Sequence, residues 1–542
     1  MGGGWVDPDS KSESLLTTSL VSGREYELVF SDEFEVDGRT FDDGHDPRWT
    51  ALHKNDYSND ALQFYSKDAM TTGDGWLNIT TTAEDTTFMA QNEKTLRYHK
   101  STKHFKSGMI QSWNKFCFTG GIFEVKMKLP GEPYIGGLWP AAWLLGNLAR
   151  ATFIGSSNWV WPWSYDTCSR KDQKKQLISA CDPNTHYDMN KYEGRGASEI
   201  DLLEAMPGKE NLLFSKVNKP YFSTSLQIAP GVESRPGNGV WPGPGQWYEG
   251  LEFGENTTTN IFFYGVHNTF KSMDSPDYTY WSDAVSGNTQ MNQVLWAVPH
   301  VYRVEWLLPQ DDQEGYGWIK WFMDEEMVWG IEGSSIYKAT KASIPSEPMY
   351  MLLNVAMSST WGFPQPCPDD CDCECFDCNG DADCTCGIAK GFCNSLPAQF
   401  MIDYVRVYQS SNHTGEKVGC STPERPTKKW IEGHKHWYMD DWQDEPLKKQ
   451  MVPPPSFPLL HASPAPPASP CLVCGSFLLP HTHILPPVLV VPGGWGQVHA
   501  GLRLRRRLRP RLLHRSPLGE GQIPMWLHLR LDGALLQARS WL

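Results

Sequence analysis

The sequence has no run of about 18 uninterrupted apolar residues, and its first 13 residues, MGGGWVDPDSKSE, contain no apolar stretch. The first absence argues against a membrane-spanning helix within these 542 residues. The second argues against a signal peptide at their start. Long stretches with a 3.6-residue apolar period are also few, so a helical fold is not expected.

Acidic residues greatly outnumber basic residues before residue 451. Residues 451–542 hold nine Arg, no Lys and two acidic residues, which leaves 39 basic and 61 acidic residues in 1–450, a charge of about −22. Such an acidic body argues against a nucleic-acid partner or an anionic membrane surface. With 24 Trp and 20 Tyr, a neutral hydroxylated ligand fits better, because sugar rings offer apolar faces to aromatic side chains and hydroxyls to carboxylates.

The C-terminal part differs in composition from the rest. Residues 451–542 contain 15 of the 40 prolines and no Asn, Lys or Tyr. The run LRLRRRLRPRLLHR (502–515) could be a basic interaction tail, but a disordered tail or a non-native reading frame accounts better for the whole stretch. We therefore expect an N-terminal segment (1–24), one domain (25–450) and a tail that takes no part in the fold (451–542).

Short apolar or aromatic runs separated by Gly, Pro, Asn and Asp turns extend from Tyr26 to Tyr408. In GGIFEVKMKL (120–129) apolar residues alternate with charged ones, which is typical of a half-buried antiparallel strand. In FMIDYVRVYQ (400–409) strict alternation predicts that Ile402 faces away from Val405 and Val407. Many short strands with regular turns predict an all-β fold, a β-sandwich or jelly roll with long loop insertions.

Eight of the 14 cysteines fall between Cys367 and Cys393, and three Asn-X-Thr sequons suggest glycosylation at Asn78, Asn256 and Asn412. Together they favour an oxidising, secretory compartment. The Cys-rich segment 367–393 could bind zinc through Cys-X-Cys or Cys-X-X-Cys pairs, and its acids show no EF-hand spacing for calcium. We favour a disulfide knot, and we expect neither a metal nor a cofactor.

The stretch GASEIDLLEAMPG (196–208) places three acids in an apolar strand. Residues two apart in a strand share a face, so Glu199 and Asp201 point the same way and Glu204 should point the opposite way. If Leu202 and Leu203 together oppose one partner residue, a β-bulge returns Glu204 to the shared face. The alternative is a polar edge strand with solvated acids, which the interleaved Ile and Leu residues make a poor fit.

Three acids on one face suit a retaining glycosidase. Its two carboxyl groups stand about 5–5.5 Å apart, one ionised to attack the anomeric carbon and one protonated for the leaving oxygen. Glu199 would be the nucleophile and Glu204 the acid. Asp201 between them would orient the nucleophile and raise a neighbour's pKa.

The motif EIDLLE resembles the bulged E-x-D-x-x-E signature of glycoside hydrolase family 16. Further matching segments follow in that family's order over about 380 residues: FSDEF (30–34), DPRWT (46–50), GLWPAAWLL (137–145), HVYRVEW (300–306), PMYMLLNVAM (348–357) and IDYVRVYQ (402–409). Other segments look like the beta-glucan synthesis-associated branch of the family: VWPWSYDTC (160–168), SAC (179–181), GRGASEIDLLEA (194–205), STSLQIAP (223–230) and VGCSTPERPT (418–427). Ser198 departs from that branch, which usually has Pro there.

The resemblance implies a concanavalin-like jelly roll and several site residues. Trp139, Trp143 and Trp361 would stack on sugars or else pack in the core, and Asn59 and Gln63 would bind glucosyl hydroxyls unless they belong to a plain loop. Cys168 and Cys181, which flank a loop before the catalytic strand, would form a disulfide. His300 is expected to be structural.

The resemblance also implies a role in building cell-wall or storage β-glucan, notably β-1,6-linked glucan. The partner would be a β-glucan oligosaccharide or polysaccharide. Three hypotheses follow: a retaining transglycosylase, an endo-β-1,3- or β-1,6-glucan hydrolase, and a catalytically silent glucan-binding protein. Members of this branch are typically type II membrane proteins with a lumenal catalytic domain. We therefore expect the secretory lumen or cell surface, with membrane association only through a segment outside this sequence.

Overall fold

A computed structural model describes residues 4–91, 98–170, 173, 176–209, 217–231, 250–260, 283–359, 361–363, 371 and 373–439. The chain divides into two units, Met1–Pro453 with Ala538–Leu542, and Pro454–Gln537. All described residues belong to the first unit. The tail expected over 451–542 lies outside the described residues.

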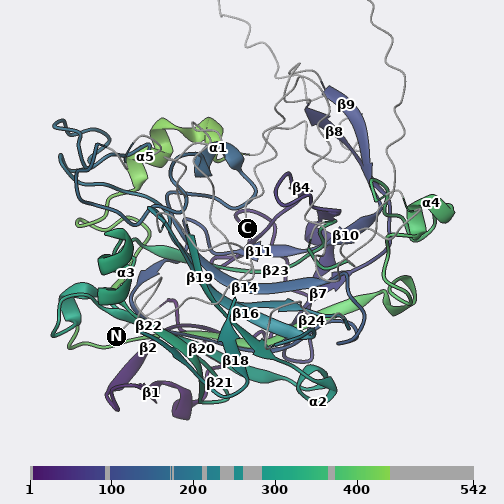
Figure 1. Ribbon diagram of the computed structural model, residues 1–542, viewed down its shortest axis with the longest axis horizontal. Coiled ribbons are helices and arrows are strands. Elements are labelled where there is room, and N and C mark those ends of the chain that lie inside the picture. The colour runs from purple at the N-terminus through teal and green to yellow at the C-terminus, as the bar shows by residue number, and fades with distance from the viewer. Residues whose placement is uncertain are drawn as a thin grey trace, which may run out of the picture. The chain divides into compact units, whose positions relative to one another are not determined.

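Two large, mostly antiparallel sheets make up the described fold (Figure 1). The first sheet has the order β1 (Leu16–Thr18), β2 (Glu25–Asp32), β24 (Ala398–Gln409), β13 (Gly121–Lys128), β20 (His300–Leu307), β21 (Trp318–Met323), β22 (Glu326–Glu332) and β17 (Leu251–Phe253), with β6 (Met70–Gly73) and β7 (Trp76–Thr81) joined to β24. The second has the order β18 (Thr257–Thr259), β19 (Asp283–Gln290), β16 (Tyr221–Ile228), β15 (Glu199–Met206), β14 (Trp139–Gly146), β23 (Met349–Ala356), β11 (Met109–Gln111) and β3 (Thr50–Ala51), with β12 (Phe118–Thr119) paired to β23 and β25 (Lys417–Val418) paired to β12.

Smaller elements decorate the sandwich. A three-stranded sheet joins β10 (Phe105–Ser107), β5 (Gln63–Tyr65) and β4 (Lys54–Asn55), and a hairpin pairs β8 (Thr86–Gln91) with β9 (Tyr98–Lys103). The α-helices are short: α1 (Ile154–Ser157), α2 (Gln293–Ala297), α3 (Gly333–Thr340), α4 (Ala382–Thr385) and α5 (Lys428–Gly433). The 3-10 turns are η1 (Ser12–Ser14), η2 (Lys67–Ala69), η4 (Pro309–Asp311), η5 (Cys393–Ser395) and η6 (Lys435–Trp437). Among the described residues, no helix has both the length and the apolar character that crossing a membrane requires.

The main core lies between the two sheets. It takes Phe123 and Val125 from β13 and Ile200 and Leu203 from β15, all buried. The expected alternation in β13 is present, because its charged residues are only half-buried while the apolar ones enter this core. The prediction of an all-β sandwich with long insertions is confirmed.

One prediction about the side of a strand on which a residue lies was wrong. Ile402 enters the same core as Val405 and Val407, although strict alternation would place it on the opposite face. The register between β13 and β24 shifts between Lys126 and Met127, so that Asp403 is an extra residue. This bulge inverts the alternation at that point.

The N-terminal residues pack onto the first sheet. The Ser19 hydroxyl and the Leu20 N–H donate to the two carboxylate oxygens of Glu305, at 2.6 and 2.7 Å, and β1 pairs with β2. Residues 16–18 are therefore part of the sandwich, although we expected the domain to begin at residue 25.

Disulfides hold the insertions. The Cys-rich segment contains Cys371–Cys386, Cys375–Cys384 and Cys378–Cys393, so these six thiols are paired as disulfides, which is the alternative we favoured over zinc. Cys168 pairs with Cys181, as expected. A further bridge, Cys117–Cys420, joins residues 303 positions apart.

Candidate active site

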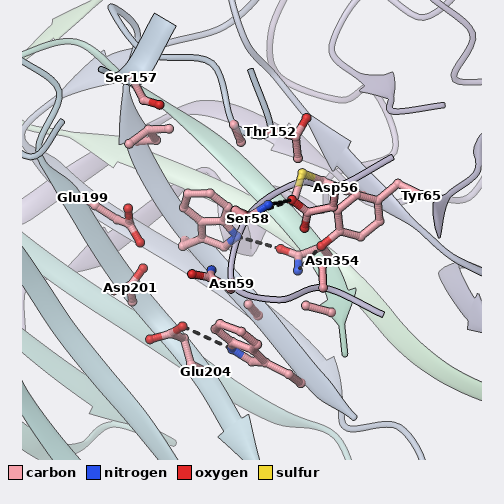
Figure 2. A pocket seen from close by; sticks show the side chains of 18 of the residues that line it. Asp56, Ser58, Asn59, Tyr65, Thr152, Ser157, Glu199, Asp201, Glu204 and Asn354 are labelled. Atoms are coloured by element: carbon pink, nitrogen blue, oxygen red, sulfur yellow. Dashed lines mark hydrogen bonds between the residues drawn. The ribbon is translucent and has the colours of Figure 1, made fainter. Parts of the chain in front are cut away.

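A bulge in β15 brings the three acids to one face. On the neighbouring strand β16, Asp201 lies opposite Ser225 and Glu204 opposite Ser223, so only one residue faces the pair Leu202–Leu203. The same shift occurs against β14. The bulge lies where the phase of the acids predicts it, and Figure 2 shows the three carboxylates in a row along the strand. The interleaved Ile200, Leu202 and Leu203 lie in the core.

Glu199 receives a hydrogen bond from an inserted segment. The β14–β15 insertion, residues 147–198, contains α1 and the motif VWPW. The Trp161 indole N–H donates to Glu199 Oε2 at 2.6 Å. Hydrogen bonding also links the Glu199 and Asp201 side chains. A donor aimed at one oxygen stabilises the ionised form of a carboxylate.

Asp201 is buried between the two glutamates and takes its donors from β16. Ser225 Oγ donates to Asp201 Oδ2 at 2.5 Å, and Gln227 Nε2 lies 3.3 Å from the same oxygen. Ser223, Ser225 and Gln227 alternate along β16 and share its outer face. Polar residues at every second position of a buried strand are the signal that could have identified these partners.

Glu204 differs from Glu199 in its hydrogen bonding. The Trp139 indole N–H donates to Glu204 Oε1 at 3.2 Å (Figure 2). The other oxygen, Oε2, is buried and has no hydrogen-bond partner among the described residues. A buried carboxyl oxygen without a donor favours the protonated form, because nothing compensates for the charge there.

The electrostatics of the cluster favour retained protons. Burial, followed by the charges of Asp201 and Glu204, raises the pKa of Glu199 well above its usual range, and the Trp161 N–H opposes this. Burial raises the pKa of Asp201 to about 6, against the donation from Ser225. Burial and then the Asp201 charge raise the pKa of Glu204 well above its usual range. Three adjacent buried carboxyl groups cannot all ionise at neutral pH.

A cavity of about 1020 Å³, including its open mouth, lies over these acids. Asp56, Ser58 and Asn59 line it from one loop, and residues 150–161 of the β14–β15 insertion line it from another. The Asp56 carboxylate shapes the first loop by accepting from the Ser58 N–H and hydroxyl, at 3.0 and 2.6 Å. The cavity therefore has acids on its floor and polar side chains on its walls.

The expected sugar-binding residues fall into two groups. Trp139, Trp143 and Asn59 line the cavity, and the Trp143 N–H donates to Asn354 Oδ1 at 2.7 Å. Trp361 does not line it; its ring packs against Trp139 with centroids 4.1 Å apart.

Gln63 does not line the cavity either. Its side chain is fully buried, donates to Asp56 Oδ2 at 3.2 Å and accepts from the Met357 N–H at 2.8 Å. Because β5 pairs on both sides and turns this residue inward, Gln63 supports the loop that carries Asn59.

Other predicted residues lie outside the cavity. His300 Nδ1 bonds Asp324 Oδ2 at 2.5 Å on the first sheet, which agrees with a structural role. Of the sequon residues, Asn256 and Asn412 are exposed and Asn78 is half-buried in β7. Trp161, Ser225, Gln227 and Asn354 were not singled out as site residues, although all four lie in segments that carry the family resemblance.

Among the residues that the structure describes, one group of side chains has metal-ligand chemistry. Asp85, His104 and Asp377 offer atoms within 4.8 Å of one another, and His104 Nδ1 lies 2.8 Å from Asp85 Oδ1. Asp85 is largely exposed. We assign no metal here, because partly exposed carboxylates around a histidine form ion pairs without one.

Comparison with known proteins shows which family the sequence resembles. A sequence profile described as "Beta-glucan synthesis-associated protein SKN1/KRE6/Sbg1" matches residues 2–366 and 391–447. The "Beta-glucan synthesis-associated protein KRE6" of Saccharomyces cerevisiae is 31% identical over 467 residues, covering 81% of this chain and 54% of that protein. The "Beta-glucan synthesis-associated protein SKN1" of Candida albicans is 30% identical over 459 residues, covering 80% and 52%. The chain thus spans about half the length of these curated relatives.

Among solved structures, the laminarinase catalytic domain from Thermotoga maritima MSB8 is 17% identical with a TM-score of 0.38, covering 71% of this chain and 99% of that one. The endo-beta-1,3-glucanase from Pyrococcus furiosus is 16% identical with a TM-score of 0.37, covering 73% and 98%. The family profile, in contrast, matches well over half of the sequence and includes the strand with the three acids. The chain belongs to the beta-glucan synthesis-associated SKN1/KRE6/Sbg1 family.

Proposed function

We propose that this protein is a retaining β-glucan-active glycosidase or transglycosylase that takes part in β-glucan biosynthesis, notably of β-1,6-linked glucan. The observation that carries the proposal is the row of Glu199, Asp201 and Glu204 on the floor of one cavity. The two glutamates have different environments, and this difference supports different roles. Glu199 has a donor for its anion, whereas Glu204 keeps one oxygen free of donors.

In this mechanism Glu199 attacks the anomeric carbon as its bond to the leaving oxygen breaks. Glu204 Oε2 gives its proton to that oxygen, and a covalent glycosyl-enzyme forms on Glu199. The Asp201 and Glu199 side chains share a hydrogen bond, and Asp201 can take up the proton of that bond as Glu199 ionises for the attack. In the second step Glu204 takes a proton from the acceptor, and the sugar is released with its original configuration.

The acceptor decides between synthesis and breakdown. Water gives a hydrolase, and a sugar hydroxyl gives a transglycosylase through the same intermediate. We favour a sugar acceptor, because the family takes its description from β-glucan synthesis. Incubation with defined β-1,3- and β-1,6-oligosaccharides separates the two: longer products support transglycosylation, and only shorter ones support the alternative of an endo-hydrolase.

The cellular setting is part of the proposal. Disulfides such as Cys117–Cys420 and Cys168–Cys181 support an oxidising compartment, which we take to be the secretory lumen or cell surface. Exposed Asn256 and Asn412 would carry glycans. We further propose one glucan-active domain over residues 25–450, joined by residues 16–18 of β1, and membrane association only through a segment outside this sequence.

Substitution of the two glutamates tests the catalytic roles. Glu199→Gln removes the attacking oxygen with little change of shape, so turnover should fall by at least about 10⁴-fold with the circular dichroism spectrum unchanged. Glu204→Ala should lose activity on natural glucan. It should still accept a substrate with a good leaving group, and azide should then restore turnover and give a β-glycosyl azide.

The matched control is Glu326→Gln, which changes an exposed glutamate on β22 and should leave turnover unaltered. Wild-type turnover in Glu199→Gln would show that the nucleophile is misassigned. If the folded, glycosylated wild-type domain binds β-glucan but processes none, the glucan-binding hypothesis replaces the enzymatic one.

A further inference from the structure

An indole of the β14–β15 insertion reaches the strand that carries the three acids. Trp161 Nε1 donates to Glu199 Oε2 at 2.6 Å, a short hydrogen bond for an N–H donor. The indole is 8% exposed, so the bond is largely shielded from water. A short, shielded bond to the attacking carboxylate fixes both its orientation and its ionisation.

Trp161 is itself held by packing on several sides. It belongs to a satellite cluster with Phe153, Val160 and Ile178 of the same insertion and with Trp430 and Tyr438 of the C-terminal segment, residues 420–439. The backbone N–H of Trp161 donates to the Ser157 carbonyl at 2.9 Å. The disulfides Cys168–Cys181 and Cys117–Cys420 tether the two segments that form this cluster. The indole therefore has little freedom to follow Glu199 if the carboxylate moves.

We infer that Trp161 is a positioning residue that holds Glu199 ionised and aimed at the anomeric carbon. The catalytic consequence of this inference rests on the proposed function. The coupling between the Trp161 and Glu199 side chains does not. Without the indole N–H, the balance between Glu199 and Asp201 shifts toward a protonated Glu199. The shared proton would then lie on the wrong carboxyl group for attack.

Trp161→Phe tests this, because it keeps an aromatic ring and removes only the N–H donor. Losing one hydrogen bond to a charged group should lower kcat by about tenfold to a hundredfold, with KM changed less than about threefold. The acidic limb of the pH profile of kcat/KM should move to higher pH by about one unit, because Glu199 must ionise without its donor. A stacking role for Trp161 would leave that limb in place.

Trp306→Phe is the matched control. It removes an indole N–H bond of 3.0 Å to the neutral carbonyl of Pro345, inside the core. This variant should lose some stability, but the acidic limb of its pH profile should stay where it is in the wild type. A limb that moves equally in both variants would show that the shift reports general loosening of the fold, and would overturn the inference.

A stability measurement tests the coupling without any turnover. A Glu whose folded pKa is raised contributes less stability as pH rises from its unfolded pKa to its folded pKa. Trp161→Phe raises the folded pKa further, so the Tm difference from the wild type should grow between pH 4 and pH 8. In a Glu199→Gln background the same substitution should give a Tm difference that does not change with pH.

The outcomes separate the two proposals. A pH-dependent Tm difference that vanishes in the Glu199→Gln background supports the coupling even if no β-glucan is processed, in which case only the proposed function fails. Turnover on β-glucan with an unmoved acidic limb and a constant Tm difference retains the proposed function and overturns the role of Trp161.

Discussion

Each of the three carboxyl groups on β15 has its own hydrogen-bond donors, and these donors support the roles that we propose for the two glutamates. Glu199 is bonded by an indole, Asp201 by a hydroxyl and an amide, and Glu204 by an indole on one oxygen only. Glu199, the proposed nucleophile, thus has a donor for its charge, whereas Glu204, the proposed acid, has a buried oxygen without a partner among the described residues.

Removing the central charge should shift the pH dependence of turnover. The Asp201 charge raises the pKa of both Glu199 and Glu204, so Asp201→Asn should lower both. The acidic limb needs ionised Glu199 and the basic limb needs protonated Glu204, so both limbs should move to lower pH, by about one unit or more. Turnover at the new optimum should fall less than in either glutamate variant.

The pH profile of kcat/KM checks this expectation. Asp403→Asn serves as the control, because Asp403 pairs with Lys126 on the first sheet at 2.6 Å and lies outside the cavity. An optimum that stays in place or moves to higher pH in Asp201→Asn would contradict the account of the cluster.

Residue identity alone predicted part of this site. The three acids were identifiable because charged residues in an apolar strand must have partners or a function. Trp161 was not, because its bond to Glu199 depends on how a 52-residue insertion folds. The inward orientation of Gln63 likewise depends on the two neighbours of β5.

At the level of elements, the β14–β15 insertion is fixed to the sandwich by a buried ion pair. Arg195 makes two bonds to Glu347, one of them Nη2 to Oε2 at 2.7 Å, and its Nη1 donates to the Pro426 carbonyl at 2.9 Å. The Arg195 side chain is fully buried. One guanidinium thus links the insertion, the approach to β23 and the C-terminal segment.

Glu347→Gln should destabilise the fold by about 3 kcal/mol, because it leaves a buried cation without its counter-charge. Chemical denaturation measures the change in the free energy of unfolding. The control is Glu193→Gln, which breaks the partly exposed pair with Arg425 and should cost less than about 1 kcal/mol. Equal, small losses in both variants would show that the buried pair does not anchor the insertion.

Two bulges show which strand irregularities a sequence reveals. The bulge in β15 was predictable, because without it one acid would enter the core. The bulge at Asp403 in β24 was not, since the residues around it suit either face and nothing in the pattern penalises regular alternation.

At the level of the whole molecule, the pattern of strands in the sequence predicted the fold class. It did not predict which residues far apart in the sequence are linked. The Cys168–Cys181 bridge spans 13 residues beside the catalytic strand and was expected. Cys117–Cys420 spans 303 residues, and no local pattern indicates which distant cysteine is the partner. The pairing of residues 16–18 with the sandwich was also not predictable from the sequence, because strand pairing at a sheet edge depends on the final arrangement of the sheet.

The central claim is that β-glucan is processed through a covalent bond to Glu199. The most direct test uses a β-1,3- or β-1,6-linked glucose disaccharide whose reducing-end sugar carries fluorine at C2 and a good leaving group at C1. The protein is incubated with this compound and its peptides are analysed by mass spectrometry. The fluorine slows both formation and breakdown of the intermediate, and the good leaving group restores the rate of formation, so the intermediate accumulates. We predict one fluorinated disaccharide unit, located on Glu199 by fragmentation of its peptide, and none in Glu199→Gln. An adduct on another carboxylate, or no adduct on protein that turns over β-glucan, would contradict the account.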